Sequence, residues 1–461
     1  MAKKIHFVGI AGNGMSALAQ IHAMSGDIVS GSDRLMDKGF TSLPLWSVFK
    51  KLNIKLHRQD GSGVTPDLNL VVLSSAIEAE NRDWDKAKDL KLPIAHRSEL
   101  LARHISQFNT VAVSGTSGKS TTAAMIFEMM EKAGKQPSII NGAALLSLQE
   151  RGFAGNIYRG TSNQLVIEAD ESDGSLTNYH PAIGVFLNLT KDHKELPVLA
   201  GYFRHFRGNC KKFLVNADED NLAEFRDKGE ITFGLKNGTY RAEDIELGAS
   251  SSSFTVRKTK FTLPHCGIHN VQNAIAAIAA CSELGIPLKD CAEGLAGFSG
   301  VARRFASMGR VDDIEVVDDF AHNPAKISAA LSAAHLRGKR VLAFYQPHGY
   351  APVKLLMNEL IDSFASSLKD GDMLWMPDIY YIGGTADKTV STKQLIDGIA
   401  ARGRQAFFLP SREDILPRIV DAARPGDVIM VMGARDPSIA DYARSVVNGL
   451  KKSRAAGVQR S

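Results

Sequence analysis

Cysteine is scarce in this chain of 461 residues, which has only Cys210, Cys266, Cys281 and Cys291. No two of them form a Cys-x-x-Cys pair, so a disulfide framework is excluded and a reducing compartment is favoured. Long apolar runs are lacking too. No segment approaches the roughly 18 unbroken apolar residues that cross a bilayer, and the apolar stretch at the N-terminus is too short for a signal peptide. We therefore expect neither a secreted nor a membrane protein.

An excess of charge of one sign is also missing. Lys and Arg together number 55 and Asp and Glu 50, so the formal net charge is only +5. This balance gives no case for a protein that coats nucleic acid. Hydrophobic residues make up 44% and charged residues 23%, which argues against disorder and leaves apolar material for several cores. At roughly 150 residues per domain, the length suggests about three domains.

Short apolar segments rich in Val, Ile and Phe alternate with segments of helical spacing. The expected strands lie at 5–9, 70–73, 110–114, 165–168, 183–188, 314–318, 341–345 and 428–432. This alternation predicts α/β domains, each with a mostly parallel sheet and helices on both faces. The serine run 250–253 is expected to be a loop.

Two glycine turns that each follow an expected strand, and a later glycine-rich stretch, divide the chain into three parts. The strands with their turns lie at 5–14 and 111–119, and the stretch 297–300 precedes another strand. We predict a Rossmann-like domain over 1–107, a central P-loop domain over 108–299 and a second Rossmann-like α/β domain over 300–461.

The segment 111–122 has the pattern of a phosphate-binding loop between a strand and a helix. Backbone N–H groups near Gly115 and Gly118, together with the helix N-terminus, make a cradle for an anion. Lys119 can reach the β- and γ-phosphates of a nucleotide, and the Ser120 hydroxyl can ligate Mg²⁺. The loop is a short variant, because Val113 stands where the general pattern has glycine. The predicted nucleotide-binding residues here are Gly115, Thr116, Ser117, Gly118, Lys119, Ser120 and Thr121.

Further polar signals follow later strands. Residues 168–173 read Glu-Ala-Asp-Glu-Ser-Asp, which suits either a Mg²⁺ site beside the loop or a solvated acidic turn. His193, shortly after another apolar strand, is either a metal ligand or an ordinary loop histidine. His269, Asn270 and Asn273 open an alanine-rich helix, where the asparagines can bind an adenine edge or cap the helix.

Together, and in this order, these elements resemble the Mur ligases, which are ATP-dependent amide-forming ligases of peptidoglycan assembly. The matching motifs are GTSGKST, EADESD, a strand ending in Asn with Asp-His after it, Gly-x-His-Asn-x-x-Asn, Arg-Arg-Phe and DDFAHNP. They span nearly the whole chain. The N-terminal segments 9–16, 30–33 and 74–77 are similar to those of family members that act on UDP-N-acetylmuramate.

The resemblance implies the reaction and the roles of residues in it. ATP phosphorylates a carboxylate, and an amine then attacks the acyl phosphate to form an amide. The implied catalytic residues are Lys119, Glu168, His193 and Arg304. Two Mg²⁺ ions are implied, with Ser120, Glu168 and His193 as ligands. His269, Asn270 and Asn273 would face adenine, Arg304 would reach the γ-phosphate, Asp319 would contact the ATP ribose, and Arg303 is expected to be structural.

The first glycine turn reads Gly-x-x-Gly-x-Gly, which by itself is a weak dinucleotide signal. Asp33, about 20 residues further on, suits a ribose hydroxyl. The resemblance implies that this domain holds the UDP of the substrate, through Gly9, Gly12, Asn13, Gly14, Met15, Asp33, Ser74 and Ser75. An NAD-dependent oxidoreductase is the competing interpretation, and it leaves GTSGKST and DDFAHNP without a role.

Departures from the family concentrate where the amine acceptor binds. The family pattern Phe-Gln-Pro-His-Arg-Tyr-x-Arg supplies arginines that hold the acceptor's carboxylate. Here Gly349 and Pro352 occupy the two arginine positions. Ser117 and Asn323 also stand where the family has histidine, and Arg435 where a glycine is common. The remaining acceptor candidates are His322, His348, Tyr350, Lys354 and Arg435.

The resemblance therefore implies an ATP-dependent ligase that joins UDP-N-acetylmuramate, or a similar donor, to an amino acid, either L-alanine or another. Attachment of a whole peptide, and a donor outside peptidoglycan synthesis, remain open. A nucleotide-binding regulator without catalysis is a further alternative, against which the retention of Lys119, Glu168 and His193 argues. Neither nucleic acid nor a membrane is indicated as a partner, and we expect a cytoplasmic protein.

Overall fold

The structure is a computed structural model, and it describes residues 2–37, 44–74, 77, 80–171, 174–190, 195–227, 229–381 and 388–458. The side chains of Asn13, Pro44 and residues 456–458 are not described. The chain divides into two compact units. One comprises Met1–Glu243, Thr255–Phe261 and Gln272–Ser299, and the other Asp244–Phe254, Thr262–Val271 and Gly300–Ser461.

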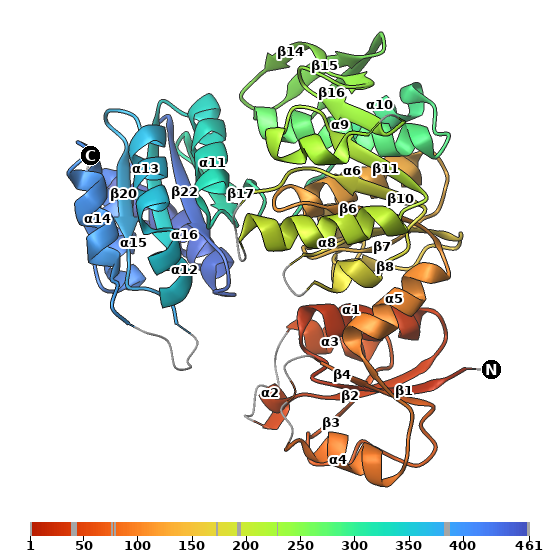
Figure 1. The fold of residues 1–461 in the computed structure, drawn as a ribbon. Coiled ribbons are helices and arrows are strands. Elements are labelled where there is room, and N and C mark those ends of the chain that lie inside the picture. Colours follow the sequence, from red (N-terminus) through yellow and green to blue (C-terminus); the bar gives the residue numbers. More distant parts are fainter. Residues whose placement is uncertain are drawn as a thin grey trace. The chain divides into compact units, whose positions relative to one another are not determined.

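The N-terminal part of the first unit is built on a five-stranded parallel sheet of order β3-β2-β1-β4-β5 (Figure 1). Its strands are β1 (Lys4–Val8), β2 (Ile28–Ser32), β3 (Lys55–His57), β4 (Leu70–Leu73) and β5 (Ile94–His96). Its helices are α1 (Asn13–Met24), α2 (Arg34–Asp37), α3 (Pro44–Lys51), α4 (Arg82–Asp89) and α5 (Arg97–Ser106). Successive residues of β1 point to opposite faces, so Phe7 and Val8 are buried in two different apolar clusters.

The central part of the chain holds an eight-stranded sheet of order β13-β12-β11-β10-β6-β9-β7-β8, parallel except for the β7–β8 pair. Its strands are β6 (Asn109–Ser114), β7 (Ser138–Ile140), β8 (Ile157–Tyr158), β9 (Gln164–Glu168), β10 (Ile183–Phe186), β11 (Lys212–Asn216), β12 (Ile231–Gly234) and β13 (Tyr240–Arg241). The α-helices of this region are α6 (Lys119–Lys132), α7 (Leu146–Glu150), α8 (Leu196–Asn209), α9 (Ile268–Glu283) and α10 (Leu288–Ala296). Two 3₁₀ turns, η1 (Ser175–Asn178) and η2 (Asp220–Phe225), lie between strands.

A small three-stranded sheet, β14 (Glu243–Leu247), β15 (Ser252–Val256) and β16 (Thr259–Leu263), precedes α9 in the sequence. The serine run 250–253, expected to be a loop, enters β15 at Ser252. The Ser252 side chain is buried, and its hydroxyl donates to the carbonyl of His265 at 2.9 Å. The loop prediction was therefore wrong for the second half of the run. A serine can be buried in a strand when its hydroxyl finds a hydrogen-bond acceptor, as that of Ser252 does.

The C-terminal part carries a six-stranded sheet of order β17-β18-β22-β19-β20-β21, with only β17 antiparallel. Its strands are β17 (Ala306–Val311), β18 (Ile314–Asp319), β19 (Arg340–Gln346), β20 (Met373–Met376), β21 (Gln405–Phe408) and β22 (Asp427–Gly433). Its helices are α11 (Pro324–Arg337), α12 (Tyr350–Leu355), α13 (Met357–Ser367), α14 (Thr392–Ala400), α15 (Arg412–Ala422) and α16 (Ile439–Val458). Along β19, Ala343 packs with residues of α11, α13 and α14, whereas Leu342 and Phe344 pack with α15 and α16. Helices thus cover both faces.

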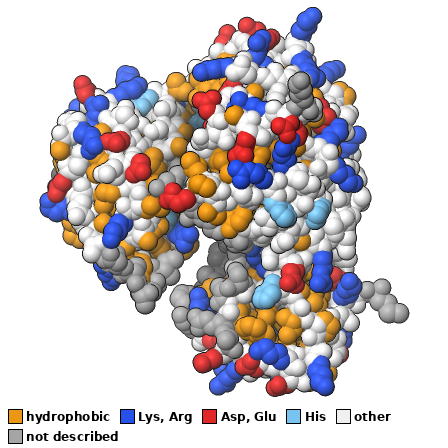
Figure 2. Space-filling model, viewed as in Figure 1, with side chains coloured by type: hydrophobic (Ala, Val, Ile, Leu, Met, Phe, Trp, Pro, Cys, Tyr) orange, Lys and Arg blue, Asp and Glu red, His pale blue; other side chains and the backbone are white. Residues whose placement is uncertain are grey.

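The α/β fold class is confirmed, and so are all the strands expected from short apolar segments, with ends that differ by at most two residues. No helix in the described part of the chain combines the length and the apolar character that crossing a membrane requires. On the face drawn in Figure 2, basic and acidic side chains are interspersed, which agrees with the near balance of charge in the sequence.

A fully buried carboxylate ties α4 to the N-terminal sheet. One oxygen of Asp83 accepts a hydrogen bond from the N–H of Gly61 at 2.6 Å, and the other accepts one from the hydroxyl of Ser32 in β2. The ring of His6 lies beside it, with Nε2 3.8 Å from Oδ2. Asp83 thus joins a helix, a loop and a strand.

We expect Asp83→Ala to destabilise the N-terminal domain by roughly 2–4 kcal/mol, because each buried polar group left without a partner costs about 1–3 kcal/mol. Denaturation followed by tryptophan fluorescence tests this, since Trp46 and Trp84 lie in this domain. Asp85→Ala is the matched control, because the Asp85–Lys88 pair is exposed. Equal losses of stability in the two variants would contradict the assignment.

Candidate active site

The phosphate loop lies at the carboxyl edge of the eight-stranded sheet, between β6 and α6. β6 pairs with β9 on one side and β10 on the other, so the segments that follow these two strands meet the loop. Gly118, just before α6, has φ +84°, and a Cβ there would overlap the side-chain oxygen of Asn273. Only glycine fits both conditions. Ser120 and Thr121, in the first turn of α6, are buried.

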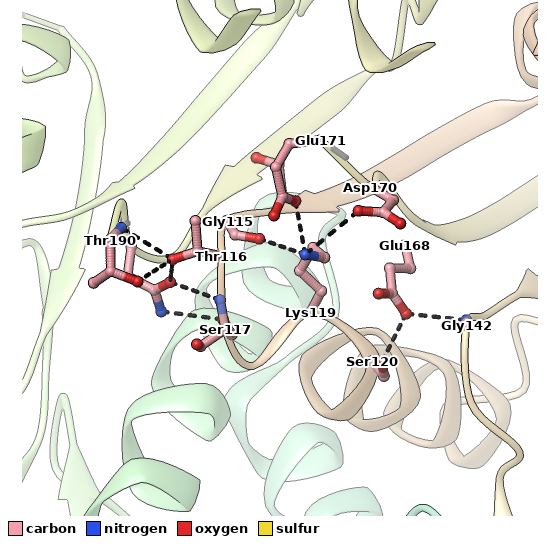
Figure 3. Close-up of polar contacts among 12 residues, drawn as sticks. Gly115, Thr116, Ser117, Lys119, Ser120, Gly142, Glu168, Asp170, Glu171 and Thr190 are labelled. Carbon is pink, nitrogen blue, oxygen red and sulfur yellow. Dashed lines mark hydrogen bonds and ion pairs between the residues drawn. The ribbon is translucent and has the colours of Figure 1, made fainter. Parts of the chain in front are cut away.

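Lys119 is engaged in a buried ion pair (Figure 3). Its Nζ donates to a carboxylate oxygen of Glu171 and to the carbonyl of Gly115, both at 2.7 Å, and lies 3.9 Å from Asp170. Burial by itself lowers the pKa of Lys119, but the neighbouring carboxylates, Glu171 foremost, outweigh it and raise the pKa. The amine therefore remains a cation.

Glu168 and Ser120 offer two neighbouring oxygen atoms that could bind a metal ion. The Ser120 hydroxyl donates to Oε2 of Glu168 at 2.7 Å, and the N–H of Gly142 donates to the same oxygen at 3.0 Å (Figure 3). Mg²⁺ usually binds one or two protein oxygens together with waters and phosphates, so the oxygens of Ser120 and Glu168 suit a Mg²⁺ site. Among the described residues, no three His, Cys, Asp or Glu side chains gather around a single point as in an all-protein metal cage.

Asn188, two residues beyond β10, holds the loop in shape. Its Oδ1 accepts from the N–H of Ser117 at 2.8 Å and from the Thr116 hydroxyl at 3.0 Å, while its Nδ2 donates to the Ser117 carbonyl at 3.0 Å. Thr190 contributes two further contacts to the Thr116 hydroxyl, at 2.7 and 3.0 Å (Figure 3). The loop is therefore fixed to the segment that follows β10.

The asparagines of α9 have different surroundings. Asn273 is buried and packs against Gly118 of the phosphate loop. Asn270 uses its side-chain amide to donate to the carbonyl of Cys266 at 2.8 Å. This is not an N-capping contact, in which a side-chain oxygen would accept from a backbone N–H. Burial lowers the pKa of His269 to about 4, so its ring is neutral at pH 7.

The N-terminal glycine turn is held by the carboxylate of Asp33. Its two oxygens accept from the backbone N–H groups of Ala11, at 2.9 Å, and Leu35, at 3.0 Å. Ser74 packs beside Gly9, and the N–H of Gly12 donates to the Gly9 carbonyl at 3.2 Å. These contacts fix the turn at the N-terminus of α1.

Arg97 packs against Gly14, so close that a Cβ at Gly14 would lie 2.8 Å from its Nη1. A guanidinium therefore lies at the glycine turn. The side chain of Met15 is buried in the apolar core, which leaves only its backbone for contact with a ligand.

Arginines and carboxylates meet at the end of β18. Asp319 accepts from the backbone N–H groups of Phe305 and Ala321, both at 2.7 Å, and burial raises its pKa, an effect that Arg304 partly offsets. Arg303 donates to the Gly433 carbonyl at 2.6 Å, which ties it to the end of β22. The guanidinium of Arg304 lies over the ring of Phe320, 4.9 Å from its centroid.

Comparison with known proteins gives consistent matches along the whole chain. Models of the Mur ligase family match three stretches, its catalytic domain over 4–109, its middle domain over 113–281 and its glutamate ligase domain over 303–435. A UDP-N-acetylmuramate–L-alanine ligase of Synechococcus elongatus is 33% identical, and one of Acetivibrio thermocellus is 35% identical, each over 94% of both chains. The chain belongs to the Mur ligase family.

Solved structures of Mur ligases have the same fold. The UDP-N-acetylmuramate–alanine ligase of Thermotoga maritima matches with a TM-score of 0.78 and 27% identity, over 98% of this chain and 99% of that one. A murein peptide ligase of Psychrobacter arcticus matches with a TM-score of 0.67 and 24% identity, over 97% and 99%, and shows the fold alone. The three-domain Mur ligase fold is thus confirmed, and the protein is an ATP-dependent carboxylate–amine ligase. ATP and Mg²⁺ are the family's cofactors.

Some predicted site residues fall outside the described part of the chain. These are His193, Ser75 and the side chain of Asn13. The domain boundaries near 107 and 299 and the roles of single residues also stay predictions.

The residues predicted to bind the amine acceptor lie at the carboxyl edge of the six-stranded sheet. The rings of His322 and His348 meet edge to face, with centroids 5.6 Å apart. Tyr350 packs against Tyr381, and Nζ of Lys354 lies 3.3 Å from the Thr389 hydroxyl. The sheet therefore gathers histidine and tyrosine rings beside the segment that departs from the family.

The two departures at 349 and 352 are structurally linked. Gly349 precedes α12 with φ +69°, and a Cβ there would lie 3.2 Å from Cδ of Pro352. The exposed Arg435 follows β22, the strand between β18 and β19. Asn323 caps α11 by accepting from the N–H of Lys326 at 3.0 Å, which gives a local reason for an asparagine at this position.

Sequence reasoning missed Glu171, Asn188 and Arg97. Glu171 lay within the acidic segment and Asn188 within a quoted motif, but neither sequence signal shows which side chain each one contacts. Arg97 lies in no recognised motif, and nothing in the sequence around it indicates that it reaches the glycine turn.

We expect Asn188→Ala to weaken ATP binding at least about tenfold, since the variant loses three hydrogen bonds to the loop and each contributes roughly 0.5–1.5 kcal/mol net. Calorimetric titration with ATP and Mg²⁺ measures the effect. Asn221→Ala is the control, because its amide donates to the Leu189 carbonyl nearby without contacting the loop. The role assigned to Asn188 is wrong if both variants bind ATP as the unaltered protein does.

Asp318 gives a pH-dependent prediction. Burial raises its pKa from 3.8 to about 6, although Nε of Arg303 lies 3.4 Å away. A carboxyl with a raised pKa favours the folded state while it is protonated, so stability falls as pH rises from about 4 through 6. Asp318→Asn cannot ionise. Relative to the unaltered protein, the stability of the variant should rise by roughly 1–2 kcal/mol between about pH 4 and 6 and stay constant at higher pH.

Thermal melting at several pH values tests this expectation. Asp313→Asn, which alters an exposed carboxyl in the preceding turn, serves as the control. A stability difference between Asp318→Asn and the unaltered protein that stays constant with pH would contradict the assignment.

Proposed function

We propose that this Mur ligase joins the carboxylate of UDP-N-acetylmuramate, or of a similar donor, to the amine of an amino acid through an acyl phosphate. The observation that carries the proposal is the convergence of Lys119, Ser120 and Glu168 at one edge of the central sheet. Relatives at 33–35% identity that are named UDP-N-acetylmuramate–L-alanine ligases support the choice of donor. Because the reaction consumes ATP, we place it in the cytoplasm.

In this proposal the phosphate loop binds the triphosphate of ATP. Lys119 binds the β- and γ-phosphates, and the other loop residues contribute backbone N–H groups and hydroxyls; they are Gly115, Thr116, Ser117, Gly118, Ser120 and Thr121. Ser120 and Glu168 would hold one Mg²⁺ and His193 a second. When bound, these ions supply positive charge to the phosphoryl oxygens.

The adenosine end of ATP is assigned to two further groups of residues. Asn273 packs against the phosphate loop, which supports a place for it, with Asn270 and the neutral His269, near adenine. We assign Arg304 to the γ-phosphate and Asp319 to the ribose. Fixed cations at these positions stabilise the charge that grows on the transferring phosphoryl group.

The N-terminal glycine turn is assigned to the UDP of the donor. Backbone N–H groups at a helix N-terminus favour a diphosphate, and the guanidinium of Arg97 adds positive charge there. The proposed contacts are Gly9, Gly12, Asn13, Gly14, Met15, Asp33, Ser74, Ser75 and Arg97.

The sequence and the structure specify the amine acceptor less closely than they specify ATP and the donor. Neither Gly349 nor Pro352 can bind a carboxylate through its side chain, so the cation must come from another residue, with Lys354 and Arg435 as candidates. His322, His348 and Tyr350 line the same edge. These departures favour, as a second candidate function, attachment of a different amine such as a peptide.

The test is ligation by the purified protein with ATP, Mg²⁺ and UDP-N-acetylmuramate, offering each amino acid and several stem peptides in turn. Phosphate release and product mass are measured. We expect one class of amine to give a product, and Lys119→Ala to release at least about 100-fold less phosphate, because its transition-state cation is lost.

Each outcome distinguishes a part of the proposal. Product with L-alanine alone means that another cation replaces the missing arginines. Product only with another amine or peptide means that the pocket has changed specificity. If ATP binds but no amine gives a product, the donor assignment is wrong.

A further inference from the structure

Among the residues that the structure describes, three carboxylates act on the amine of Lys119. Lys119 is 9% and Glu171 3% exposed, and their charged atoms lie 2.7 Å apart. Asp170 lies 3.9 Å from the same amine, and Glu168 also acts on it electrostatically. One cation thus faces three carboxylates, of which Glu171 is the closest and the most deeply buried.

A nucleotide phosphate needs the same amine that Glu171 occupies. To bind Lys119, the phosphate must displace Glu171, and a buried carboxylate left without its partner is strongly unfavourable. Free ATP adds several negative charges beside Asp170 and Glu168, and like charges held this close repel one another. The resting site therefore opposes ATP that carries no cation.

ATP in complex with a divalent cation is repelled less by these carboxylates than free ATP is. Its own negative charge is reduced, and the oxygen pair of Ser120 and Glu168, 2.7 Å apart, offers ligands of the kind that Mg²⁺ prefers. We expect the cation to bring positive charge close to the carboxylate that Glu171 withdraws from Lys119, and so to offset the loss of that partner.

We propose that Glu171 makes this site selective for metal-complexed ATP, by holding Lys119 until a nucleotide arrives with its cation. The inference rests on the proposed role of Lys119 in binding the phosphates. It assigns Glu171 the role of a specificity-determining residue, which decides the form of the nucleotide that the site admits.

The test compares ATP binding in excess EDTA and in excess MgCl₂ by calorimetry, without donor or acceptor. We expect the unaltered protein to bind ATP at least about 100-fold more weakly in EDTA. Glu171→Gln removes the charge at nearly constant shape, and it should bind ATP in EDTA at least about tenfold more tightly than the unaltered protein. Its affinity for ATP with Mg²⁺ should change less than about threefold.

Two control variants separate charge from structure. Glu171→Asp keeps the charge, so it should still exclude metal-free ATP. Glu224→Gln removes an exposed carboxylate that pairs with Arg204 elsewhere in the same unit, and it should behave as the unaltered protein does. Thermal melting of each variant reports its folding.

The outcomes separate this inference from the proposed function. If Glu171→Gln gains no affinity for ATP in EDTA, or if Glu171→Asp gains as much, the selectivity role is overturned while the ligase assignment stands. Equal affinity of the unaltered protein in EDTA and Mg²⁺ also overturns it, even if Glu171→Gln fails to fold. If Lys119→Ala binds ATP with Mg²⁺ as tightly as the unaltered protein, the proposed phosphate site itself is wrong.

Discussion

The order of three parallel strands is the constraint on which the site depends. With β6 between β9 and β10, the phosphate loop, Glu168 and Asn188 all emerge at the same carboxyl edge. Ligand sites in open α/β sheets form outside these strand ends. The apolar faces of the strands hold this order in place, so the core residues of β6, β9 and β10 determine where the chemistry can occur.

Rigidity and charge are divided between two sides of the phosphate loop. On the β10 side, the neutral contacts of Asn188 and Thr190 fix the backbone that forms the anion cradle. On the β9 side, carboxylates surround Lys119 and Ser120 (Figure 3). Asn188 and Thr190 thus act mainly on the shape of the cradle and the carboxylates mainly on its charge, while Lys119 contributes to both through its bond to the Gly115 carbonyl.

The sequence predicted the elements that depend on local patterns. The strands were found because each is a short apolar run, and the loop at 115–121 because phosphate binding demands glycines and a lysine at fixed spacing. The pairing of Lys119 with Glu171 and of Ser117 with Asn188 joins residues 52 and 71 positions apart, which only the sheet order brings together. Arg97 at Gly14 was missed for the same reason, since the two residues are distant in the chain. Ser252 in β15 was missed because a serine run lacks the apolar pattern of a strand, although its acceptor His265 lies only 13 positions away.

The conformation at Gly349 has a consequence for how this acceptor pocket can evolve. A side chain there would enter at φ +69° and press on the ring of Pro352. Arginine at 349 is therefore disfavoured while proline stands at 352, and arginine at 352 alone would leave the first position empty. The two positions are therefore coupled, because the cost of a side chain at 349 depends on which residue stands at 352.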